Sequence, residues 1–170
     1  MTAAPETYAL ARTVSRILGW IYTLSWSLSF YPQPIHNYQR RTTQGLAIDF
    51  PTANVLGFTS YTTFTAAFLF SPLVRSQYAY RNPKSPIPTV QYNDFAFAVH
   101  GLVLCLITYS QFWPAVWGFK VEAWQKASAP LLGICFGGIF AVVIIALIVL
   151  FDGKGHGSYL NGWAWIDVVR

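Results

Sequence analysis

The most distinctive group of side chains that could do chemistry lies at residues 29–41. The stretch SFYPQPIHNYQRR places Pro32, Gln33 and Pro34 after an aromatic, apolar run and just before two arginines. A proline inside a helix removes one backbone hydrogen bond and clashes with the preceding turn. These prolines therefore predict either the end of a helix or a hinge within one.

Asp94 immediately precedes the apolar run FAFAVHGLVLCLITY and allows two interpretations. Its carboxylate can cap the helix by accepting a hydrogen bond from a free backbone N–H. It can also act as a functional carboxylate at a membrane boundary. Capping favours the ionised form and burial favours the protonated form, so a carboxylate that exchanges protons needs the two effects nearly balanced.

Asn54 lies one turn into the segment PTANVLGFTSYTTF, too deep to be an obvious cap. A buried amide costs free energy unless it is hydrogen-bonded. Asn54 is therefore either a link between helices or a group that binds a ligand.

The other reactive residue types do not combine into a site. His36 and His100 could in principle ligate a haem, but no second pair exists, and a packed or hydrogen-bonded histidine is the favoured interpretation. Cys105 and Cys135 fall inside apolar segments, where thiols pack as small apolar groups. The six acidic residues are scattered, and no nucleotide, zinc or serine-hydrolase motif is present. We expect no enzyme, no cofactor, no metal and no nucleic-acid partner.

Composition indicates a membrane protein. Of 170 residues, 54% are hydrophobic and 10% are charged, against about 25% charged in soluble domains. Segments of about 20 residues or more, long enough to cross a bilayer as helices, carry no acidic or basic residue apart from histidines; they are 17–39, 51–74, 95–119 and 127–151. We expect four transmembrane helices in a bundle with a polar interior, since their Ser, Thr, Tyr and Asn side chains should turn away from lipid.

Orientation is not settled by charge. Lys and Arg slightly favour a cytosolic N-terminus, and residues 1–16 form a short segment without the features of a removable signal peptide.

Five short motifs follow one another between residues 17 and 108: SFYPQ, N-x-x-R-R, G-L-x-x-D-F, N-x-x-G-F and N-D-x-x-F-x-x-H. Together they resemble the cystine exporters of the PQ-loop family. The resemblance implies an all-α membrane fold in which a linking helix joins two three-helix bundles, seven helices in all. Here it implies a first three-helix bundle at 17–119, a linking transmembrane helix at 127–151, and at 152–170 a loop and the start of a truncated fifth helix.

The same resemblance implies proton-coupled export of cystine from a lysosome or vacuole, with the N-terminus in the lumen. Trp26, Phe30 and Asn54 match positions lining the family's cystine pocket, and Asp94 matches its proton-coupling aspartate. The residues 32–34 then act as a hinge rather than a stop.

The chain departs from the family pattern because it has four expected spans instead of seven. Either it is a truncated form, or two copies pair as a homodimer so that each supplies one bundle. The alternative function is a non-transporting membrane fragment or adaptor that retains the first bundle.

Overall fold

The computed structural model describes residues 5–151 and 163–170, and these residues form helices and connecting loops without a β-sheet. The expected all-α fold is confirmed, whereas the loop expected at 152–162 lies outside the described residues. The helices are α1 (Pro5–Ser29), α2 (Pro32–Arg40), α3 (Asp49–Phe70), α4 (Pro72–Arg81), α5 (Tyr92–Ser110), α6 (Pro114–Trp117), α7 (Ala129–Phe151) and α8 (Trp165–Val169).

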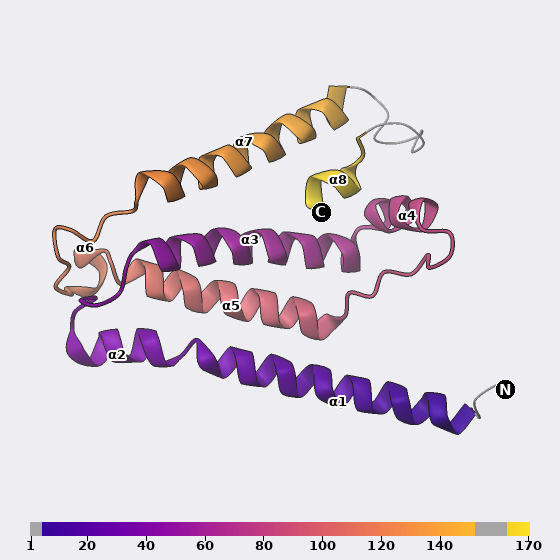
Figure 1. The fold of residues 1–170 in the computed structure, drawn as a ribbon, viewed down its shortest axis with the longest axis horizontal. Coiled ribbons are helices and arrows are strands. Elements are labelled where there is room, and N and C mark those ends of the chain that lie inside the picture. Colours follow the sequence, from indigo (N-terminus) through magenta and orange to yellow (C-terminus); the bar gives the residue numbers. More distant parts are fainter. Residues whose placement is uncertain (1–4, 152–162) are drawn as a thin grey trace.

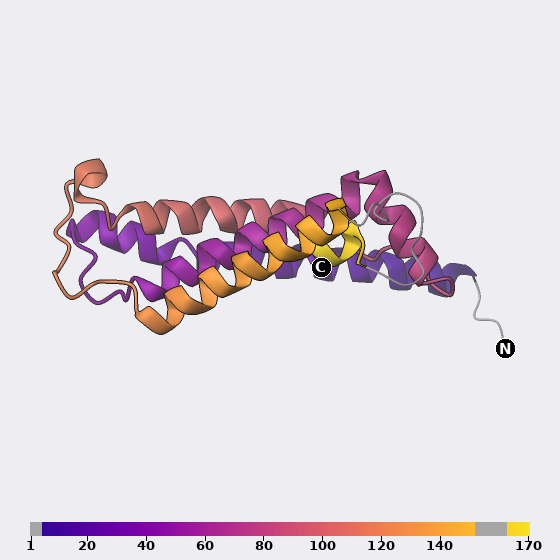
Figure 2. The ribbon, with the colours of Figure 1, turned by 90° about the horizontal axis from the view of Figure 1, so that it is seen from above.

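The centre of the molecule is the pair α3 and α5, which lie side by side along most of their length (Figure 1). Helices α1 and α2 follow one another along one side of α5, and α7 runs along the other side of α3. Seen from above, α7 also runs along the long axis of the molecule, beside the other long helices (Figure 2). The segments expected to form the first bundle therefore pack on one another through α5.

Prolines decide where several helices start. Pro32, Pro72 and Pro114 each stand at the beginning of a helix, where a missing N–H costs nothing because that donor has no partner within the helix. The third expected span, 95–119, accordingly stops at Ser110 in α5, and 114–117 form the separate turn α6.

The first helix differs from the expectation at its start. Residues 5–16, expected as a separate segment, belong to α1. The expected membrane span began at residue 17 because Arg12 and Arg16 are charged and disfavour burial in lipid. A charged residue can still be part of a helix, so α1 extends beyond the expected span.

Among the described helices, α5 and α7 have both the length and the apolar composition to cross a membrane. Apolar side chains on α7 are widely exposed, for example Ile134 at 72% and Phe140 at 66%. Such a surface suits contact with lipid or with another apolar helix. Helices α1 and α3 are long enough but more polar, so the four-span arrangement stays a prediction.

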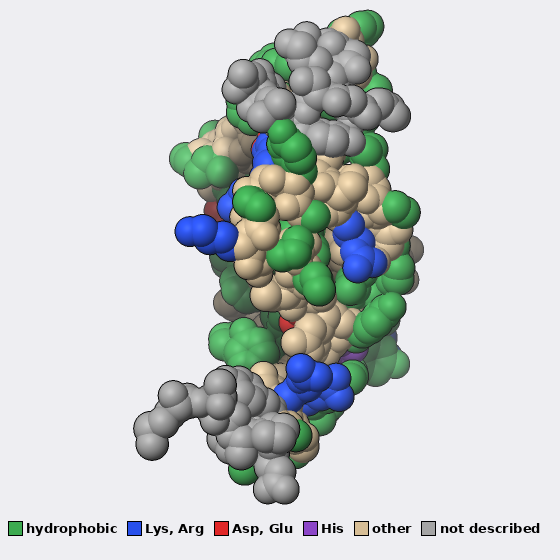
Figure 3. Space-filling view, turned by 90° about the vertical axis from the view of Figure 1, so that its right-hand side faces the viewer, with side chains coloured by type: hydrophobic (Ala, Val, Ile, Leu, Met, Phe, Trp, Pro, Cys, Tyr) green, Lys and Arg blue, Asp and Glu red, His purple; other side chains and the backbone are tan. Residues whose placement is uncertain are grey.

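The end of the molecule that carries the N-terminus also carries α4 and α8, and basic side chains are scattered over it (Figure 3). Here Ile166 of α8 and the preceding Ala164 form a small core with Phe68 and Val74. Arg81 donates two hydrogen bonds to Asp167, at 2.6 and 2.9 Å. Burial raises the pKa of Asp167, but the Arg81 guanidinium and the Ala164 N–H outweigh it and hold that pKa below its usual range.

At the opposite end, Gln125 joins the loop after α2 to the loop after α6. Its Nε2 donates to the carbonyls of Thr43 (2.8 Å) and Leu46 (2.7 Å). Its Oε1 accepts from Thr43 Oγ1 (3.1 Å) and from the Glu122 N–H (2.9 Å). Because Gln125 is 6% exposed, these bonds have little competition from water.

Candidate functional site

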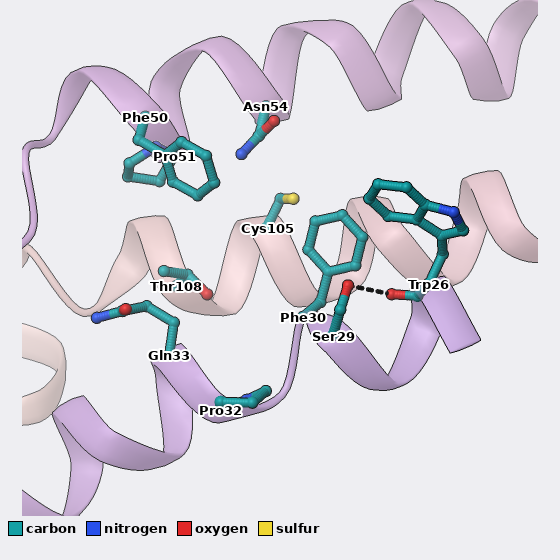
Figure 4. A pocket seen from close by; sticks show the side chains of 10 residues that line it. All are labelled: Trp26, Ser29, Phe30, Pro32, Gln33, Phe50, Pro51, Asn54, Cys105 and Thr108. Carbon is teal, nitrogen blue, oxygen red and sulfur yellow. Dashed lines mark hydrogen bonds between the residues drawn. The ribbon is translucent and has the colours of Figure 1, made fainter. Parts of the chain in front are cut away.

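A cavity of about 440 Å³ lies where α1 ends and α2 begins, and α3 and α5 form its other walls (Figure 4). Its volume is within the roughly 300–1,000 Å³ typical of small-molecule sites. None of its lining residues carries a formal charge. They are Trp26, Ser29, Phe30, Pro32, Gln33, Phe50, Pro51, Asn54, Cys105 and Thr108.

The structure brings Trp26, Phe30 and Asn54, the residues matched to a substrate pocket, together on this cavity. Trp26 lies in the last turn of α1 and Phe30 directly follows that helix, and the two side chains point the same way into the cavity. Asn54 faces them from the first turns of α3. Among the described residues its amide has no hydrogen-bond partner, which leaves it available to a ligand.

A row of aromatic rings fixes the Phe30 side of the cavity. The Phe30 ring meets Phe58 edge to face at 5.3 Å between centroids, and Phe58 meets Phe97 at 5.8 Å. Phe58 in turn lies directly over Gly101 of α5, where a Cβ would overlap its ring. The absence of a side chain at Gly101 therefore lets α3 and α5 approach closely enough to hold this row in place.

The joint between α1 and α2 is a tight turn rather than a continuous kinked helix. Phe30 N and Tyr31 N donate to carbonyls three residues back, each at 3.3 Å. Pro34 has no N–H to offer the Phe30 carbonyl, so the helical pattern cannot run through. The Tyr31 hydroxyl is hydrogen-bonded to His100 Nε2 at 2.8 Å, which ties the joint to α5.

A chain of side-chain amides continues from the cavity into the protein. Gln33 Nε2 donates to Asn37 Oδ1 (3.0 Å), Asn37 Nδ2 donates to Gln111 Oε1 (2.8 Å), and Gln111 Nε2 donates to the Pro34 carbonyl (2.9 Å). Pro34 itself is buried behind the cavity and does not line it. This chain fastens α2 to the end of α5.

Asp94 lies away from the cavity. It stands eleven residues before Cys105 on α5, which corresponds to about 16 Å along the helix. The helix α5 begins at Tyr92 with Gln91 as its N-cap, so Asp94 is the third residue of the helix and not the N-cap expected from the sequence. Its Oδ2 accepts a hydrogen bond from the Gln91 N–H at 2.8 Å, the contact that a carboxylate at this position makes in a capping box. Any exchange of protons at Asp94 would have to be linked to the cavity through the helices.

The histidines are not paired with each other. His36 contacts the guanidinium of Arg40 at 3.3 Å, and His100 is bonded to Tyr31. Within the part of the chain that the structure describes, no cluster of His, Cys, Asp or Glu is suited to hold a metal ion.

Sequence reasoning missed several residues of the site. Asn37 could have been found from its position four residues after Gln33, on the same face of a helix. Gln111, Cys105 and Thr108 reach the site from α5, far along the chain, and no local pattern pointed to them. They are brought there by the packing of α5 against α2 and α3.

Comparison with known protein families identifies a repeat in this chain. Residues 14–74, which include the α1–α2 joint and all of α3, match the family model described as PQ loop repeat. The chain therefore carries a PQ loop repeat, as its motifs indicated.

Individual proteins with similar sequences show which PQ-loop proteins the chain resembles. The chain is 46% identical over 157 residues to a cystinosin homolog from Dictyostelium discoideum, an alignment that covers 92% of this chain and 50% of that protein. It is 36% identical over 153 residues to the cystinosin of Drosophila melanogaster, covering 90% and 35%. A cystine transporter of Saccharomyces cerevisiae is 25% identical over 112 residues, covering 65% and 42%. The chain is thus cystinosin-like, and it spans about half the length, or less, of the curated relatives it matches.

Proposed function

We propose that the cavity at the α1–α2 joint is a substrate site for cystine in a proton-coupled transporter of the lysosomal or vacuolar membrane. The observation that carries the proposal is the meeting of Trp26, Phe30 and Asn54 on one cavity at the PQ segment. The names of the relatives, cystinosin and cystine transporter, support the choice of substrate.

The chemistry of the cavity suits this ligand. Cystine has an ammonium and a carboxylate at each end, joined by an apolar disulfide-bridged middle. The Asn54 amide can bond to either charged group, while Trp26 and Phe30 provide an apolar wall and a face for a cation. An uncharged cavity also matches a ligand whose charges balance.

The proposed movement uses the joint. Residues 32–34 act as the hinge at which α1 and α2 change their angle, so that the cavity opens to one side of the membrane and then to the other. The broken hydrogen-bond pattern at Phe30 and Tyr31 supports this, since fewer backbone bonds oppose bending there.

Asp94 is the proposed proton carrier. The proposed driving force is the flow of protons from an acidic compartment to the neutral cytosol, to which cystine export is coupled at this carboxylate. Because Asp94 is about 16 Å along α5 from the cavity, the coupling would pass through the packing of α5 against α1 and α3.

In this proposal, a transport path across the membrane needs a second helix bundle facing the cavity. A second copy of the chain or a second bundle is proposed to supply it. The alternative is a membrane adaptor that keeps the fold of the first bundle but moves no substrate.

The test is binding and transport of radiolabelled cystine by the chain reconstituted in lipid. Trp26→Leu and Asn54→Leu should each weaken binding about tenfold or more, because they remove an aromatic face and the unbonded amide. Trp124→Leu is the matched control, since Trp124 is exposed and lies between α6 and α7. Cystine binding without movement across vesicles would favour the adaptor, and binding unchanged in both cavity variants would refute the site.

A further inference from the structure

The amide chain behind the cavity has a direction that cannot be reversed. The Pro34 carbonyl can only accept, so the end of Gln111 that meets it must be the Nε2 donor. Gln111 then presents Oε1 to Asn37, which must donate through Nδ2. Asn37 in turn presents Oδ1, which accepts from Gln33 Nε2. One backbone carbonyl thereby fixes the orientation of three side-chain amides, an assignment otherwise open to a flip.

Burial keeps this chain intact. Asn37 is 2% exposed and Gln111 is 1% exposed, so water does not compete for their bonds. Gln33 is half-buried and lines the cavity. Its Oε1 has no partner among the described residues, and with Nε2 engaged by Asn37 the amide is held with that acceptor unused.

The hydroxyls that line the cavity have also used their protons. Ser29 Oγ donates to the Trp26 carbonyl at 2.6 Å, drawn as a dashed line in Figure 4. Thr108 Oγ1 donates to the Leu104 carbonyl at 2.9 Å. Each hydroxyl therefore offers the cavity lone pairs rather than a donor.

The backbone around the joint has the same character. The start of a helix ordinarily attracts anions through its free N–H groups, but Pro32 and Pro34 remove two of these groups from α2. The end of α1, which carries the partial negative charge of a helix C-terminus, reaches the cavity at Ser29. The Phe30 carbonyl lacks the donor that a residue other than proline would supply at position 34.

We infer that this wall of the cavity binds an organic ammonium group, with Gln33 Oε1 as its acceptor and Asn37 and Gln111 as positioning residues. The inference rests on the proposed function, in which an amino acid supplies the ammonium. The faces of Trp26 and Phe30 add a favourable surface for the cation. The carboxylate of the same ligand is left to Asn54, whose amide has an unused donor.

Three related ligands allow the contributions of the ammonium and carboxylate groups to binding to be measured separately. Cystine carries both groups, cystamine lacks the carboxylates, and 3,3′-dithiodipropionic acid lacks the ammonium groups. Their affinities for the full chain in lipid nanodiscs can be measured by calorimetry. We expect cystamine to bind at least about tenfold more tightly than the diacid, because a hydrogen bond to a charged group contributes that much.

Gln33→Met keeps the length of the side chain and removes the acceptor. It should weaken cystine and cystamine about tenfold and leave the diacid unchanged. Gln39→Met, the same change at an exposed position of α2, is the control and should alter none of the three affinities.

Asn37 tests the positioning role. Asn37→Leu frees the Gln33 amide to turn, so the preference for cystamine over the diacid should shrink. Asn37→Asp still accepts from Gln33 Nε2 and should keep the preference, even if stability falls. If the Asn37 variants do not fold, Gln33→Met still decides, because that side chain is half-buried at the cavity wall.

The outcomes distinguish this inference from the proposed function. Equal or tighter binding of the diacid, no binding of cystamine, or unchanged cystamine affinity in Gln33→Met overturns the ammonium assignment. Binding of cystamine without cystine, lost in Gln33→Met, would refute the cystine site and leave the ammonium assignment standing. If cystine binds and its affinity is unchanged in Gln33→Met, the cystine site stands and the ammonium assignment is refuted.

Discussion

Gly101 offers the sharpest test of how α3 and α5 hold the cavity. A Cβ built at this position would overlap Cε1 of Phe58 and lie 2.7 and 2.8 Å from Cζ and Cδ1 of the same ring. The ring cannot simply move aside, because Phe30 packs on it at 5.3 Å and Phe97 at 5.8 Å. Gly101→Ala should therefore push the two helices apart or displace the row of aromatic rings.

The magnitude follows from two opposing effects. Overpacking of this kind costs about 1–3 kcal/mol, while alanine is better than glycine inside a helix by about 0.8–1 kcal/mol. Gly57 on α3 provides the matched control, because a Cβ there meets no atom within 4 Å. The propensity gain is common to both variants, so the free energy of unfolding should differ between them by about 1–3 kcal/mol.

Thermal unfolding in detergent, followed by tryptophan fluorescence, measures this difference. At about 2–4 °C per kcal/mol for a chain of this size, Gly101→Ala should melt several degrees below Gly57→Ala. Near-ultraviolet circular dichroism should also change in the first variant, as its aromatic rings shift. Equal melting temperatures together with unchanged aromatic signals would refute the argument that Gly101 sets the spacing of α3 and α5.

Three further outcomes are expected. Asp94→Asn should abolish proton-driven cystine movement while Asp94→Ala also costs about 0.5–2 kcal/mol of stability, because the Gln91 N–H loses its acceptor; normal pH dependence in the Asn variant would rule out the coupling role. The folded pKa of Asp167 is depressed by Arg81, so its stabilisation is present above the unfolded pKa and is lost as pH falls through the folded value. Melting temperatures in acid should therefore fall more steeply for the parent than for Asp167→Asn, and parallel curves would count against the ion pair. Gln125→Leu, which leaves buried partners unsatisfied, should lower unfolding free energy by at least about 2 kcal/mol in denaturant titration, against no change for exposed Gln39→Leu.

The sequence predicted those features that depend on neighbouring residues. Pro32 and Pro34 mark the joint because a proline cannot donate to the preceding turn, wherever the chain then runs. The four-residue spacing of Trp26 and Phe30 predicted that they share a face, and both line the cavity although Phe30 lies just after α1 ends. Asp94 at the start of an apolar run pointed to a helix start for the same local reason, although the N-cap is Gln91, three residues earlier.

Local patterns misplaced some boundaries. The expected span beginning at residue 17 rested on charge, but α1 starts at Pro5 because basic residues are compatible with a helix outside lipid. The segment 95–119 read as one apolar run, yet Pro114 separates α6 from α5.

What the tertiary structure alone decided are the contacts between distant parts of the chain. Asn37 and Gln111 lie 74 positions apart, and their bond exists because α2 packs on the end of α5. Through Asn37, the same packing holds the Gln33 amide by its Nε2 and leaves the oxygen of this cavity-lining residue without a partner among the described residues. Asn54 looked equally suited to linking helices or to binding a ligand, and its place opposite Trp26 with no partner among the described residues could not be read from periodicity. Periodicity assigns a residue to a face of its own helix, whereas a cavity is defined by which faces of different helices meet.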